Sequence, residues 1–141
     1  MSAPSAVAAD EGCWPPPAAA AVAVRVLQSE LTVAALACGA PEPYAAFVDR
    51  QGDALRRHSD SLIAYFEAAH GEAAGQQAVD AFVTQLANQA SARKVDWTAG
   101  YCDFMRAVTL RAAETAPDAL GQLARMQPHA RKLLKAQACR P

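Results

Sequence analysis

A single apolar stretch decides the fold: AAVAVRVLQSELTVAALAC, residues 20–38. Within it, apolar side chains recur at intervals of three or four residues, at Val24, Leu27, Leu31, Ala34 and Cys38. This spacing predicts an amphipathic helix with its last cysteine on the buried face. Gly39 should end the helix, because glycine readily adopts the conformation that closes one, and Pro41 and Pro43 prevent its continuation.

Three further helices are predicted after this one, over residues 43–70, 72–92 and 96–116. The first has an inward stripe with two polar members: Tyr44, Val48, Gln51, Leu55, His58, Leu62 and Phe66. The second has the inward residues Val79, Phe82, Val83, Leu86 and Ala90. The third is expected to begin with Asp96 as its N-cap. Its stripe is aromatic and has heptad-like spacing: Trp97, Tyr101, Phe104 and Val108.

Two shorter helical segments are expected at the C-terminus. Thr115 and Asp118 have the spacing of a helix-capping signal, which predicts a short helix to Met126. Pro128 opens a last helical segment that ends near Cys139. The chain has 141 residues, which suits one domain. We therefore predict an all-α domain over residues 21–141, with a disulfide-stapled four-helix core and a short C-terminal helical extension.

Residues 1–20 are expected to form an irregular lead rich in proline and alanine, because prolines 15 to 17 favour an extended conformation. Residues 5–10 are similar to the end of a secretory signal, with cleavage after Ala8 or Ala9. Either the lead is the remnant of a signal peptide, or the similarity is a coincidence of alanine-rich sequence. No run approaches the roughly 20 apolar residues that a membrane span needs, so we expect no transmembrane segment.

The four cysteines indicate disulfide bonds. Cys13 and Cys139 lie near the two ends of the chain, while Cys38 and Cys102 fall within predicted helices. Four cysteines allow three pairings, and we favour Cys13–Cys139 with Cys38–Cys102, because the inner pair lies on apolar helix faces. No two cysteines have the C-x-x-C spacing of redox pairs, zinc sites or c-type haem attachment. Paired cysteines in a small chain favour an oxidising compartment, so a periplasmic or secreted protein is expected.

Charge is distributed unevenly along the chain. The net charge is −1, but residues 125–141 contain five cations and no acid, which leaves −6 for the rest. Four of these cations, Arg125, Arg131, Lys132 and Lys135, are candidate partner-binding residues. They could simply complement the dipole of a solvated helix, or they could dock an acidic protein or anionic lipid headgroups. Nucleic-acid binding is not expected, because the basic segment is short and lacks interleaved aromatic residues.

No motif for catalysis, metal binding or cofactor binding stands out, so we expect no enzyme activity, metal or cofactor. Glu67 and His70 form a single Glu-x-x-His unit, whereas a di-iron bundle needs two such units, and a surface contact is expected instead. His58 lies on an apolar stripe and is expected to be a core histidine, with a pH-sensitive contact or a haem ligand as alternatives. Met105 could be a second haem ligand, but it is expected to fill the core.

Several runs resemble one group of proteins. The runs are LQSELTVAALAC at 27–38, YAAFV at 44–48, FVTQLANQASAR at 82–93 and Tyr-Cys at 101–102. In these runs, and broadly from Cys13 to Cys139, the chain is similar to a group of small, uncharacterised exported helical proteins of alphaproteobacteria. The resemblance implies export and paired cysteines, and it implies no activity or functional site.

Together these observations favour a helical interaction protein, for example a small accessory subunit of a larger envelope complex. Its docking surface would be an exposed face of the bundle or the basic C-terminal segment. The alternative is a carrier of a small ligand or cofactor, with a pocket between helices near Gln51, His58 and Tyr101.

Overall fold

The computed structural model describes residues 14–97 and 99–136, and over these residues the chain forms six α-helices, one short 3-10 turn and no strand. The elements are α2 (Pro16–Ala37), α3 (Glu42–His70), α4 (Glu72–Asp96), α5 (Tyr101–Glu114), η1 (Pro117–Ala119), α6 (Leu120–Arg125) and α7 (Pro128–Ala136). The prediction of an all-α fold is therefore confirmed.

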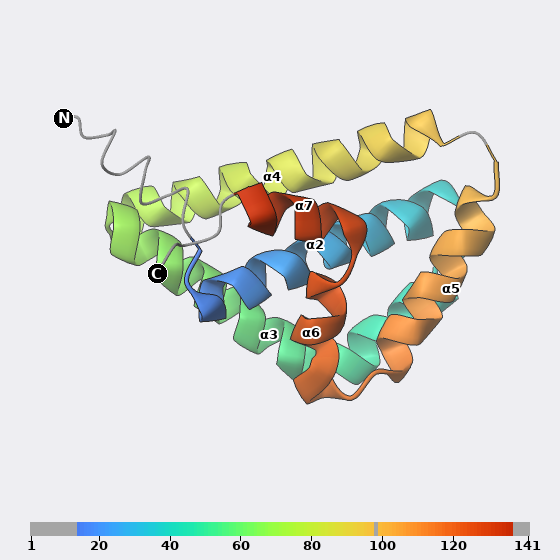
Figure 1. Cartoon of the computed structure of the whole chain (residues 1–141), viewed down its shortest axis with the longest axis horizontal. Coiled ribbons are helices and arrows are strands. Elements are labelled where there is room, and N and C mark those ends of the chain that lie inside the picture. Colours follow the sequence, from blue (N-terminus) through green and yellow to red (C-terminus); the bar gives the residue numbers. More distant parts are fainter. Residues whose placement is uncertain (1–13, 98, 137–141) are drawn as a thin grey trace.

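Helix α2 is the centre of the molecule. It contacts α3, α4, α5, α6 and α7, which lie around it in Figure 1. The predicted inward residues Val24, Leu27 and Leu31 are at most 2% exposed, but Val22 and Val26 on other sides of the helix are also buried. A helix that is apolar on all sides is one that other elements cover. More sides of α2 are thus buried than the single stripe that its spacing predicts.

Helix α2 is also long and apolar enough to cross a membrane, as judged by length and composition. The core helix of a globular domain and a signal sequence both meet the same criterion. More than half of its most apolar window is buried against the other helices. The packing of α2 in the described fold is that of a core helix.

The start of α2 corrects the expected irregular lead. Pro15 has the extended conformation expected of a polyproline segment, with φ −67° and ψ 159°, but the helix begins at Pro16 instead of near residue 20. Proline is tolerated in the first turn, because the N–H group that it lacks would have no partner there. The preceding Trp14 is 7% exposed and packs against Tyr65 and Phe82, with ring centroids 5.1 and 5.8 Å away. Residues 5–10 lie outside the described residues.

The inward faces of α3 and α4 follow the predicted periodicity with one shift. In α3, Gln51, Leu62 and Phe66 are buried as expected, but Phe47 is fully buried while Val48 is 39% exposed. The aromatic ring of Phe47 packs against Tyr44, with a centroid distance of 5.9 Å. In α4, the predicted inward residues are buried or packed against the core: Val79, Phe82, Val83, Leu86 and Ala90.

The boundary between α4 and α5 differs from the prediction. Helix α4 continues to Asp96, so this residue ends a helix and does not cap the next one. Helix α5 starts only at Tyr101, after Gly100 in the left-handed conformation with φ +77°. The predicted aromatic stripe is consequently misplaced, since Trp97 is 40% and Phe104 53% exposed.

Small side chains explain which face of α5 turns inward. The buried residues of this helix are Met105, Thr109, Ala112 and Ala113. Three of the four, Thr109, Ala112 and Ala113, are small, which favours close packing of this face against α2 and α3. The capping signal proposed after α5 is also wrong: the Thr115 hydroxyl donates a hydrogen bond to the Arg111 carbonyl at 2.8 Å, so Thr115 closes α5.

Helices α6 and α7 fold back onto α2, as Figure 1 shows. Leu120 and Ala124 of α6 and Ala130 of α7 are fully buried. The predicted C-terminal extension therefore completes the core, and its polar side chains face outward.

Candidate functional site

A disulfide bond joins the end of α2 to the first turn of α5. The Cys38 and Cys102 Cα atoms are 5.7 Å apart and the sulfur atoms are bonded, which confirms the predicted inner pair. The bond lies at the surface, because Cys38 is half-buried and Cys102 is exposed. The expectation that Cys38 lies on a buried helix face is therefore only partly met. The expected pair of Cys13 and Cys139 lies outside the described residues.

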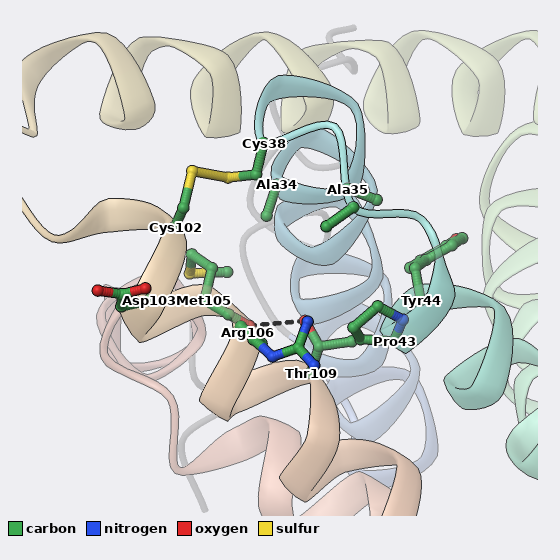
Figure 2. A pocket seen from close by; sticks show the side chains of 11 residues that line it. Ala34, Ala35, Cys38, Pro43, Tyr44, Cys102, Asp103, Met105, Arg106 and Thr109 are labelled. Carbon is green, nitrogen blue, oxygen red and sulfur yellow. Dashed lines mark hydrogen bonds between the residues drawn. A yellow bond between two sulfur atoms is a disulfide. The ribbon is translucent and has the colours of Figure 1, made fainter.

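A pocket of about 180 Å3 opens beside this disulfide, between the end of α2, the start of α3 and the first turns of α5 (Figure 2). Its walls are mostly apolar or small: Ala34, Ala35, Cys38, Ala40, Pro43, Tyr44, Cys102, Met105 and Thr109. Asp103 and Arg106 complete the lining. The sequence signals no such pocket, because its walls come from three segments that only the packing of α5 brings together.

Exposed apolar side chains gather at the same end of the molecule. Val95 is 76% exposed and lies near the end of α4, where Trp97 and Phe104 pack on each other with ring centroids 5.1 Å apart. Tyr101 also packs against Trp97, with ring centroids 5.5 Å apart in a T-shaped arrangement. We call Val95, Trp97, Tyr101 and Phe104 the aromatic end. Exposed aromatic clusters are rare on isolated proteins and typical of contact surfaces.

The four predicted partner-binding cations lie together on α6 and α7. Arg125, Arg131, Lys132 and Lys135 are exposed and line one open depression of about 560 Å3, with Pro128 and Leu134. No acid lines this depression, and within the described residues none of the four cations forms an ion pair. We call this surface the basic face. The structure thus brings together all four residues that the charge pattern selected.

A charged cluster holds α7 against α2 and α4. The Glu30 carboxylate accepts a hydrogen bond from Arg93 Nε at 3.1 Å and forms an ion pair with Arg93 Nη2 at 3.0 Å. His129 Nε2 lies 3.7 Å from the same oxygen. Burial raises the pKa of the Glu30 carboxyl, and the adjacent Arg93 opposes this rise. Burial also lowers the pKa of His129, as do the nearby cations Arg93 and Lys132. The only sequence signal for this cluster is a lone acid within an apolar helix.

The three residues proposed to surround a ligand do not meet. Gln51 is fully buried, and its Nε2 donates to the carbonyls of Ala112 and Thr115 at 2.9 and 2.7 Å, which joins α3 to the end of α5. Tyr101 lies at the opposite end of α5. His58 lies beside Gly121 of α6. His58 lines two depressions, but neither is lined by Gln51 or Tyr101, so the three residues do not share a pocket.

The histidines and Met105 occupy separate environments. Burial lowers the pKa of His58, as does the neighbouring Arg57. Met105 is buried and lines the pocket beside the disulfide, which His58 does not line, so these two residues are not placed as a pair of haem ligands. His70 stacks on Phe66 at the end of α3. Among the described residues, no three His, Cys, Asp or Glu side chains are grouped in a way that could hold a metal ion.

Comparison of the chain with models of protein families, with curated proteins and with solved structures gives no match. Three surfaces of the described chain are therefore the candidates for function: the pocket, the aromatic end and the basic face.

Proposed function

We propose that this protein is a periplasmic or secreted interaction protein, a small accessory subunit that docks on a larger envelope complex through its basic face. The observation that carries the proposal is the gathering of Arg125, Arg131, Lys132 and Lys135 around one depression without an acid. Unpaired cations on one face attract an acidic partner and raise the rate of association. Catalysis has no part in this proposal.

The rest of the chain favours a protein partner over a nucleic acid. Because the net charge is −1 and residues 125–141 carry five cations, the remaining surface is acidic and would repel a long polyanion. The apolar Pro128 and Leu134 in the depression would contact a protein surface. The Cys38–Cys102 disulfide is compatible with an oxidising compartment, which supports export.

The aromatic end is a second docking surface for the same function. Trp97 and Phe104 are large, exposed and in contact with each other, and aromatic side chains of this kind dominate the energy of many interfaces. A partner could thus be recognised by charge at the basic face and by apolar contact at the aromatic end.

Charge reversal tests the proposal. The triple variant Arg131→Glu, Lys132→Glu and Lys135→Glu is compared with Arg50→Glu, Arg57→Glu and Arg111→Glu, which reverses three exposed cations on α3 and α5. Tagged protein is incubated with solubilised native envelope, and separately with vesicles of anionic lipid. We expect a specific protein partner that the first variant loses by at least about tenfold and the control variant retains.

Salt dependence completes this test. Recovery of the partner by the wild-type protein should fall as salt rises from about 50 to about 500 mM, because screening weakens contacts between exposed charges. Equal recovery by both triple variants would contradict docking through the basic face. Binding to the vesicles alone would show that the basic face recognises lipid instead of a protein.

A further inference from the structure

The pocket beside the disulfide has the dimensions of a ligand site. Its volume is about 180 Å3, and an engineered protein cavity of about 150 Å3 suffices to bind benzene. Three helices form its walls, and the Cys38–Cys102 bond holds two of these helices together at its edge. A pocket that is already formed costs little ordering entropy when a ligand enters.

The hydroxyl groups of the pocket already have partners. Tyr44 Oη is hydrogen-bonded to Thr32 at 2.8 Å, and the Thr109 hydroxyl donates to the Met105 carbonyl at 2.7 Å. The other wall residues contribute alanine, proline, methionine and disulfide surface. A polar group buried against these walls would lose its hydration without gaining a free hydroxyl partner. These walls therefore favour an apolar group in the part of a ligand that enters.

The charged groups at the pocket have different orientations. Figure 2 shows Arg106 extending from α5 toward Pro43, whereas Asp103 points to the opposite side, away from Tyr44. Within the described residues Arg106 forms no ion pair. Its guanidinium is thus available to an anion at the mouth, and guanidinium binds a carboxylate through two parallel hydrogen bonds.

We propose that this pocket binds a small monocarboxylate that carries a compact apolar group, such as an aryl or branched alkyl acid. The apolar group would fill the space between Ala35, Pro43 and Met105, and the carboxylate would pair with Arg106. The site is separate from the basic face on α6 and α7, so this proposal and the docking proposal can fail independently.

Phenylacetate is the probe for this site. Phenethylamine carries the same ring with the opposite charge, and acetate carries the carboxylate without the ring. We expect phenylacetate to bind with a Kd on the order of 1 mM and to shift the amide resonances of Ala35, Cys38 and Met105 in an NMR titration. The amine and acetate should bind at least about tenfold more weakly. Absence of phenylacetate binding, or equal binding of the amine, would overturn the proposal.

Matched variants locate the bound probe. Arg106→Gln should weaken phenylacetate binding about tenfold, whereas Arg111→Gln, which changes an exposed arginine of the same helix outside the pocket, should not. Ala35→Phe should fill the pocket and abolish binding, whereas Ala37→Phe changes an exposed residue on another side of α2 and should preserve it. Unchanged binding by Arg106→Gln, or binding that survives Ala35→Phe, overturns the proposal. Thermal unfolding shows whether Ala35→Phe folds. If it does not, the comparison of Arg106→Gln with Arg111→Gln tests the proposal without it.

Discussion

Helices α5 and α7 both pack against α2, but different forces hold them there. Helix α5 is linked to α2 by the Cys38–Cys102 bond and carries part of the aromatic end. Helix α7 is held by its buried Ala130 and by the contact of His129 with Glu30, and it carries most of the basic face. One contact surface is therefore anchored by a covalent bond, while the other is anchored by apolar packing of α7 and by a histidine–carboxylate contact that titrates.

This difference matches the chemistry of the two surfaces. Apolar recognition depends on a rigid, complementary shape, which a covalent link preserves. Electrostatic attraction acts over several ångströms and tolerates more movement of the charged side chains. Three predictions probe the contrast between α5 and α7.

The largest effect should come from breaking the covalent link. The double variant Cys38→Ser and Cys102→Ser removes a bond that closes a loop with a sequence separation of 64. Loop-closure entropy predicts that the free energy of unfolding falls by roughly 4 kcal/mol. Urea denaturation measures this change, and Arg131→Glu on α7 serves as a control with an expected change of less than about 0.5 kcal/mol. A fall of less than about 1 kcal/mol in the double variant would show that packing alone holds α5.

A smaller and more local effect should follow from weakening the anchor of α7. Glu30→Gln keeps the shape of the side chain but removes the charge that faces Arg93 and His129. We expect the amides of α7 to exchange about two- to threefold faster with solvent, since His129 of α7 lies 3.7 Å from this carboxylate, beyond hydrogen-bond distance, and an ion pair of this kind contributes about 0.5 kcal/mol. The amides of α5 should keep their protection. Glu114→Gln, which neutralises an exposed carboxylate of α5, is the control. Faster exchange in α5 and α7 alike would mean that Glu30 supports the whole fold.

The smallest effect should be a dependence of stability on pH that comes from His129, the residue of α7 that contacts Glu30. The pKa of His129 is lowered in the folded protein, so the unfolded chain binds more protons between that lowered value and the ordinary pKa of about 6.5. Stability should therefore rise with pH across this window and level off above it. Melting temperatures from about pH 5 to about pH 7 test the effect in wild type and in His129→Gln.

The variant isolates the contribution of His129. Burial also lowers the pKa of His58 and raises that of Glu30, so both groups add their own pH dependence. Both groups remain in His129→Gln. The difference between the melting-temperature profiles of the wild type and this variant therefore measures the contribution of His129. Identical profiles would show that His129 does not couple α7 to the fold.

Much of the fold is predictable from local patterns. The apolar spacing of α2 predicts its buried side chains, and Gly39, with φ +62°, follows the end of α2 as expected. The inner disulfide follows from two cysteines on predicted helices, and the basic face follows from a segment with cations and no acid. The signals for α2, Gly39 and the basic face lie in contiguous residues, so they do not depend on how distant helices pack. The disulfide does depend on packing, because Cys38 and Cys102 are 64 positions apart.

Other features depend on which helices become neighbours. The aromatic spacing of Trp97 and Phe104 predicts burial, but the smaller face of α5, with Thr109 and Ala112, packs more closely on α2 and α3. The ion pair of Glu30 with Arg93 joins residues 63 positions apart. Neither outcome has a periodic signal in the sequence, because both depend on side-chain volume and charge at contacts between distant helices.

The amino-acid sequence predicts an all-α domain, the positions of most of its helices and a cationic C-terminal segment, because helical periodicity and charge are properties of local sequence. It also favours, out of three possible pairings, the disulfide that the structure contains. The packing of the helices determines that α2 is central, that the aromatic end is exposed and that a pocket opens beside Cys38 and Cys102. These features arise where several helices meet, and the close packing of their side chains selects which faces are buried.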